Sequence, residues 1–159
     1  MKLIEEIAKE FLAQKSMTVA GASSKGDTAG NIVLKKLKKY GYKLSVLHPN
    51  AQEVDGVKSY PNITSLPELP DVVFIATHPD VTPELLHECG KAGIKRVWIH
   101  RSFGDGSYHS ESEEIANLYG ITLIPGGCPM MFLEPDIIHR CMRWFLLTTG
   151  KEALPVIHE

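Results

Sequence analysis

Residues 17–31 read MTVAGASSKGDTAGN, a short apolar run that passes directly into a loop of Gly, Ser and Ala. The run from Met17 to Ala22 shows little alternation of polar and apolar residues, which is typical of a strand buried on both faces. Small loop residues let the backbone approach a phosphate, and the free N–H groups of the next helix favour an anion. This stretch predicts a strand, a phosphate-binding loop and a helix that begins near Gly30, although the loop could also serve only the path of the chain.

Strands and helices continue to alternate after this loop. Further apolar runs predict a weak strand at 57–60 and stronger ones at 44–47, 72–76, 96–99 and 122–124. Amphipathic segments predict a last helix opened by Pro135 and earlier ones at 3–12, 32–40, 83–92 and 111–119. Right-handed crossovers between such strands give an α/β, Rossmann-like fold. We expect a doubly wound, mainly parallel sheet of five to six strands with helices on both faces.

Length and composition are those of one globular domain. The chain has 159 residues, of which 43% are hydrophobic and 23% charged, and its formal net charge is −2. This balance excludes a disordered chain and gives no basis for non-specific binding to nucleic acid or to an anionic membrane. Cys89, Cys128 and Cys141 do not form a disulfide framework, which favours a reducing cytoplasm. We expect one cytoplasmic domain over residues 1–159, with no membrane span or secretion signal.

Ligands of doubly wound sheets bind beyond the carboxyl ends of the strands, where the strand order switches. The sequence also limits which phosphate-containing ligand this site could bind. NTP hydrolysis is not expected, because the Gly-Lys-Ser/Thr of a P-loop is absent. A dinucleotide site would have a glycine where Ser23 stands and an acidic residue after the second strand, where this chain has His48-Pro49-Asn50. NAD is therefore the second choice of ligand.

A series of short motifs follows in a specific order between Met17 and Cys128. They are Val19-Ala20-Gly21-Ala22-Ser23-Ser24-Lys25, Gly30-Asn31, Gly41-Tyr42, His48-Pro49-Asn50, Gly56-Val57, Tyr60-Pro61, Leu66-Pro67, Asp71-Val72-Val73, Val97-Trp98-Ile99 and Gly120. In this order the chain resembles the stand-alone bacterial CoA-binding domain proteins. It is also similar to the CoA-binding domain at the start of the succinyl-CoA synthetase alpha subunit. The resemblance implies a Rossmann-like domain whose cofactor is coenzyme A or an acyl-CoA.

The resemblance also implies which residues hold this nucleotide ligand. The residues implied to hold the CoA phosphates are Gly21, Ala22, Ser23, Ser24, Lys25, Gly30 and Asn31. Those implied to line the nucleotide, adenine or pantetheine are Pro49, Asn50, Thr77, His78 and Pro79. Independently of the resemblance, Arg101 follows a strand at the ligand edge and could pair bidentately with a phosphate.

The chain departs from the family pattern in three places, one of which is a pair of residues. His48 stands where the family usually has Asn, His78 and Pro79 replace a more variable pair, and His100 replaces a Gln. The phosphohistidine of the synthetase lies in a second domain that these residues do not contain, so we do not expect ligase chemistry. The expected function is therefore binding of coenzyme A or an acyl-CoA by a non-catalytic or regulatory module.

Two enzymatic alternatives stay open. One is an NAD(P)-dependent oxidoreductase. The other is a small acyl-handling enzyme that uses Cys128, the one candidate for a catalytic residue, in the sequence Gly126-Gly127-Cys128-Pro129. A small buried residue under the C-terminal loop is the other interpretation of this cysteine, because unmodified Cys is often buried.

A metal site and a protein interface are further hypotheses. His48, His78, His100 and Cys128 each follow a strand, so topology brings them to one edge of the sheet as a set that Zn could accept. Such strand ends can spread over about 20 Å, so we expect no metal. A homodimer or an interaction surface could instead be formed by Met130, Met131, Phe132 and Trp144.

Overall fold

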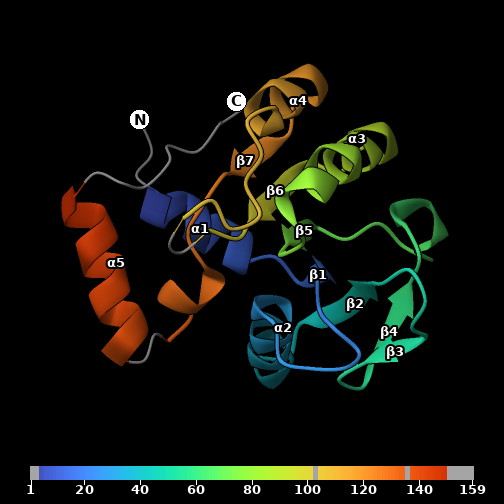
Figure 1. Ribbon diagram of the computed structural model, residues 1–159, viewed down its shortest axis with the longest axis horizontal. Coiled ribbons are helices and arrows are strands. Elements are labelled where there is room, and N and C mark those ends of the chain that lie inside the picture. Colours follow the sequence, from blue (N-terminus) through green and yellow to red (C-terminus); the bar gives the residue numbers. More distant parts are fainter. Residues whose placement is uncertain (1–3, 102–103, 135–136, 150–159) are drawn as a thin grey trace.

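Seven strands form one sheet through the middle of the computed structural model (Figure 1). The structure describes residues 4–101, 104–134 and 137–149. The strands are β1 (Ser16–Ala20), β2 (Lys43–Leu47), β3 (Glu53–Val54), β4 (Val57–Tyr60), β5 (Val72–Ile75), β6 (Arg96–Ile99) and β7 (Thr122–Ile124). Their order is β3-β4-β2-β1-β5-β6-β7, and every pair is parallel except β3 with β4. The predicted mainly parallel, Rossmann-like sheet is confirmed.

Helices cover both faces of this sheet, as predicted (Figure 1). The helices are α1 (Ile4–Leu12), α2 (Ala29–Lys39), α3 (Thr82–Ala92), α4 (Ser112–Tyr119) and α5 (Ile137–Thr149), with short 3-10 turns η1 (Ile63–Ser65), η2 (Pro79–Val81) and η3 (Pro129–Met131). One buried cluster joins α1 and α2 to one face of the strands. A second joins α3 and α4 to the other.

The strand that the sequence did not predict is β3. It is two residues long and pairs antiparallel with β4, through a tight turn in which Asp55 has φ 50° and Gly56 has φ 76°. Positive φ at both central positions is what a two-residue hairpin of type I′ requires. Two residues are too short to produce a periodic pattern, so only the Asp-Gly pair between Val54 and Val57 could have indicated this hairpin.

The amino ends of β1 and β5 are joined by Ser16 and Asp71. One carboxylate oxygen of Asp71 accepts hydrogen bonds from Ser16 N at 3.1 Å and from Ser16 Oγ at 3.0 Å. These bonds hold the pKa of Asp71 below its usual value, because they favour the ionised carboxylate. They fix the point at which the two central strands come into register.

The last helix, α5, only partly matches the predicted apolar stripe. Met142 packs against the core, and Arg143 pairs with Glu5 of α1. In the first turn of the helix, 78% of Ile137 and 70% of Ile138 are exposed. Pro135, predicted to open this helix, lies outside the described residues.

No helix within the described part of the chain is both long and apolar enough to cross a membrane.

Candidate functional site

The strand order switches between β1 and β5. From β1 the chain moves outward through β2 and β4, and it returns at β5 to build the other half of the sheet. Ala76 N, just after β5, donates to Ala20 O of β1 at 2.8 Å, so the two strand ends meet side by side. Such a switch point leaves a crevice between neighbouring loops in open α/β sheets. The loops after β1 and β5 are therefore the candidate site.

Two glycines allow these loops to approach each other. Gly21 has φ +98°, and a Cβ at this position would lie 2.2 Å from Ala76 O. A Cβ on Gly30 would lie 2.7 Å from Gly21 O. The close approach that requires both glycines is thus between protein backbones, whereas the sequence predicts small residues here for the approach of a phosphate.

Asn31, which the resemblance implies to be a phosphate-binding residue, organises the loop from within. Its side chain is 1% exposed. The amide oxygen accepts from Ser23 N at 2.8 Å and from Thr28 N at 3.1 Å. The amide nitrogen donates to Ser23 O at 2.9 Å and to Asp55 Oδ2 at 2.8 Å. Both hydrogens of this amide are therefore used inside the protein, and none is left for a ligand.

Two residues of this network were missed by the sequence reasoning. Thr28 caps α2, and its hydroxyl lies 2.8 Å from Gly21 O and accepts from Asn31 N at 3.3 Å. The three-residue spacing of Thr28 and Asn31 was a readable capping signal. Asp55 reaches the loop from the β3–β4 hairpin, and only the Asp-Gly turn marked it in the sequence.

The remaining loop residues divide into buried and accessible groups. The side chain of Ala22 is buried in the core, so a phosphate contact at this residue would involve its backbone. Ser24 and Lys25 are exposed. The side chain of Lys25 has no ion-pair partner among the described residues, so its charge is available to an anion.

Thr77 places an unused polar atom at the switch point. Its hydroxyl oxygen is buried and has no hydrogen-bond partner among the residues that the structure describes. A Cβ on Gly21 would lie 2.7 Å from Thr77 N, which shows how closely the two loops approach. Buried hydroxyl groups normally have a hydrogen-bond partner, so this oxygen is a candidate to hydrogen-bond a ligand.

The loop after β2 is shaped by His48. Its Nδ1 accepts from Asn50 N at 3.1 Å and from Ala51 N at 2.9 Å. An accepting Nδ1 places the proton of the neutral ring on Nε2. Pro49 and Asn50 are exposed, and no carboxylate stands at the end of β2 itself, as the sequence indicated.

The proposed metal ligands do not gather into a site. No group of three His, Cys, Asp or Glu side chains within the described ranges could hold a metal ion. His78 is exposed, and its Nδ1 lies 3.3 Å from Asp80 Oδ2, while Pro79 opens η2. His100 instead packs edge-on to Phe74 at 6.1 Å, and burial lowers its pKa.

Arg101 is held by its own loop. Its Nε donates to Gly104 O at 2.9 Å, and its guanidinium lies 5.0 Å from the centre of the Tyr108 ring. A second nitrogen lies 3.5 Å from Asp105. The expected bidentate contact with a phosphate would have to replace these interactions.

Cys128 is 5% exposed, and burial raises the pKa of its thiol to about 11. A thiol with this pKa is protonated near neutral pH, whereas the nucleophilic form is the thiolate. The environment is that of a packed residue. The neighbouring Met131 is fully buried and Phe132 packs against Trp98 at 5.9 Å, so the apolar residues after Cys128 contribute mainly to the core.

The candidate site thus combines close-packed glycines, an accessible lysine and an unpaired buried hydroxyl at one switch point.

Residues 15–134 match the model of a protein family described as a CoA binding domain. The chain is 33% identical over 118 residues to an acetate–CoA ligase (ADP-forming) of Methanocaldococcus jannaschii, a match that covers 72% of this chain and 17% of the ligase.

Two other relatives agree with this match. The alpha subunit of acetate–CoA ligase (ADP-forming) II of Pyrococcus furiosus is 32% identical over 125 residues, which cover 74% of this chain and 27% of the subunit. The solved structure of a hypothetical protein from Pyrococcus horikoshii OT3 has a TM-score of 0.73 and 30% identity, over 80% of this chain and 88% of that one. The chain therefore spans less than a third of each ligase polypeptide and most of the small protein. All three relatives are archaeal, whereas the sequence resemblance was drawn to bacterial proteins.

Proposed function

The chain belongs to the family of CoA-binding domains, and we propose that it binds coenzyme A or an acyl-CoA between the loops that follow β1 and β5. The observation that carries the proposal is the buried, unpaired hydroxyl of Thr77 beside Gly21. This hydroxyl can donate to a phosphate or carbonyl oxygen or accept from an N–H group, and coenzyme A carries all of these.

The phosphates would lie at the start of α2. The first two N–H groups of this helix, those of Ala29 and Gly30, precede the first intrahelical hydrogen bond and carry the positive end of the helix dipole. Lys25 adds a full positive charge in the same loop. Asn31 acts indirectly, because it holds the loop in shape through Ser23 and Thr28.

We propose a binding or regulatory module in preference to an enzyme. The thiol of Cys128, the one nucleophile suggested by the sequence, is buried with a pKa of about 11. The ligase activity belongs to relatives of which this chain matches only 17% and 27%, so we do not transfer that activity to this chain. An NAD(P)-dependent reaction is not favoured, because β2 ends at His48 with no carboxylate for a ribose.

Three wider expectations remain proposals. We treat residues 1–159 as one domain, and we place it in the cytoplasm because Cys89, Cys128 and Cys141 are unpaired. A homodimer is also proposed. Of the residues that the sequence suggests for its surface, Trp144 is 67% exposed and Met131 is buried, and the exposed Ile137 and Ile138 lie on the same helix as Trp144. Native mass spectrometry of untagged protein would report both the oligomeric state and any bound nucleotide.

The variant Thr77→Val tests the ligand proposal most locally. It removes the hydroxyl and keeps the shape, so we expect an unchanged melting temperature and a CoA affinity weakened about five- to tenfold. Thr64→Val is the matched control, because its hydroxyl is exposed on η1 and bonds only to Asn62. Equal CoA affinity in wild type and Thr77→Val would place the ligand elsewhere.

A further inference from the structure

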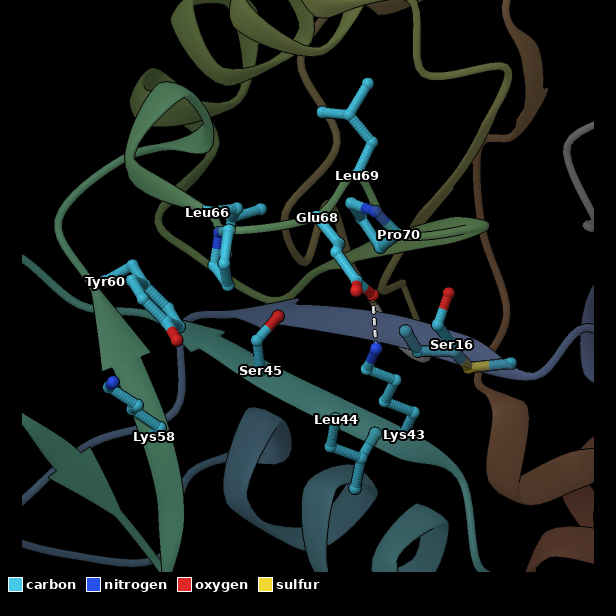
Figure 2. A pocket seen from close by; sticks show the side chains of 12 residues that line it. Ser16, Lys43, Leu44, Ser45, Lys58, Tyr60, Leu66, Glu68, Leu69 and Pro70 are labelled. Carbon is cyan, nitrogen blue, oxygen red and sulfur yellow. Dashed lines mark hydrogen bonds and ion pairs between the residues drawn. The ribbon is translucent and has the colours of Figure 1, made fainter.

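A cavity of about 180 Å³ lies toward the amino ends of β1 and β2, away from the candidate CoA site. Figure 2 shows β1, β2 and β4 beneath it and the loop of residues 66–70 above it. The connection from β4 to β5 contains the 3-10 turn η1 and that loop but no α-helix.

The sheet face beneath this cavity is unusually polar. β2 contributes Lys43 and Ser45 to the lining, and β4 contributes Lys58 and Tyr60. Strands inside a parallel sheet are normally apolar on both faces, because helices cover them. Tyr60 packs partly against the core, whereas Lys58 is exposed, so the ammonium group of Lys58 is accessible to a ligand.

Hydrogen-bond donors predominate at one end of the cavity. Thr18 Oγ1 lies 2.6 Å from Ser45 Oγ, and two hydroxyl groups in one hydrogen bond use only one of their two protons. Tyr60 OH has no hydrogen-bond partner among the described residues, and Lys58 Nζ lies 5.6 Å from the centre of the Tyr60 ring. This end therefore offers hydroxyl protons and an ammonium group.

The charged side chains that line the cavity are Lys43, Lys58 and Glu68, a net charge of +1, and Glu53 of β3 stands opposite Lys58 in the strand register. Lys43 pairs with Glu68 across the cavity, as the dashed line in Figure 2 shows, so this pair adds no net charge. Lys58 has no ion pair within the described part of the chain. At the other end, the hydroxyl of Ser16 is already bonded to Asp71, so the unused donors are those near Ser45 and Tyr60.

The opposite wall is the loop of residues 66–70, which is apolar except for Glu68, the partner of Lys43. Leu69 of this wall is 54% exposed. A volume of 180 Å³ is that of about six water molecules in the liquid, which is far too small for coenzyme A.

We propose that this cavity binds a small organic anion. Its carboxylate lies among Ser45, Lys58 and Tyr60, and its short apolar chain lies against Leu66.

NMR titration of the full 159-residue protein with sodium butyrate tests this proposal, with 1-butanol and n-butylamine as probes of equal length. We expect butyrate alone to give saturable amide shifts confined to residues 43–45, 58–60 and 66–69. Lys58→Met should weaken butyrate about tenfold, and Tyr60→Phe should weaken it about threefold. Lys39→Met is the matched control, because Lys39 is exposed on α2, and it should have no effect.

The proposal is independent of CoA binding, so the same samples are titrated with CoA. Unchanged CoA affinity in Lys58→Met and undiminished butyrate shifts in the presence of CoA support two separate sites. The proposal fails if butyrate gives no saturable shifts, if 1-butanol or n-butylamine gives the same shifts, or if Lys39→Met and Lys58→Met behave alike. Competition between CoA and butyrate would equally overturn it.

Discussion

The side-chain amide of Asn31 donates a 2.8 Å hydrogen bond to the carboxylate of Asp55, which joins α2 to the edge hairpin. The same side chain accepts from Ser23 N and Thr28 N within the loop after β1. One buried residue thus holds the helix, the loop and the hairpin together. The shape of the candidate phosphate loop depends on this residue even though its polar atoms are all used within the protein.

Replacing Asn31 by Ala should lower the free energy of unfolding by about 1–3 kcal/mol, because several buried polar groups lose their partner. Urea unfolding measures this loss. Asn117→Ala on α4, where the side chain is exposed, should change the stability by less than about 0.5 kcal/mol. If both variants lose the same stability, the network around Asn31 contributes nothing specific.

A methyl group on Gly21 should be poorly tolerated. Gly21→Ala would combine a φ of +98° with a contact of 2.2 Å to Ala76 O, and we expect a loss of more than about 2 kcal/mol. Gly26→Ala in the same loop has no neighbour within 4 Å of its new Cβ and should be nearly neutral. Thermal unfolding of the two variants compares them directly. A Gly21→Ala protein as stable as Gly26→Ala would show that the β1 and β5 loops are not in close contact.

The three thiols should differ in reactivity. Burial raises the pKa of Cys128 to about 11 and that of Cys89 to about 12, while Cys141 is exposed. Iodoacetamide near pH 8 should therefore label Cys141 first, and peptide mass spectrometry identifies the labelled site. Labelling of Cys128 as fast as Cys141 would instead support the acyl-handling enzyme.

Asp71 should make the stability of the protein fall at acidic pH. Its pKa is lowered in the folded protein from 3.8, so its contribution is present above about pH 4 and is lost as the pH falls through the folded value. Asp71→Asn should accordingly destabilise the protein at pH 7 and do so less at about pH 3. Urea unfolding at the two pH values measures the difference. An equal loss at both would mean that the ionised carboxylate does not stabilise this edge.

The fold was predictable because its signals are local and repeated. Buried strands gave uninterrupted apolar runs such as Val72–Ile75, and α3 and α4 end at Gly93 and Gly120 with left-handed backbones. The hairpin strand β3 gave no such signal, because two residues cannot show a period.

The sequence predicted only the edge of the sheet at which a ligand would lie, beyond the carboxyl ends of the strands. The strand order in the structure then narrows the candidate site to the loops after β1 and β5. The direction of each side chain depends on contacts distant in sequence, such as Asn31 with Asp55 or Arg101 with Tyr108. Residue type and spacing could not show that Asn31 turns inward, nor that Ala22 belongs to the core.

Isothermal titration of the purified protein with CoA and with NAD tests the central proposal most directly. We expect CoA to bind and NAD not to bind comparably, because the β1 loop offers Lys25 and β2 ends without a carboxylate. Lys25→Ala should weaken CoA by about 1 to 2 kcal/mol, or roughly 5- to 30-fold, through loss of a charge-assisted phosphate contact. Tighter binding of NAD than of CoA, or no binding of CoA at all, would contradict the proposed function.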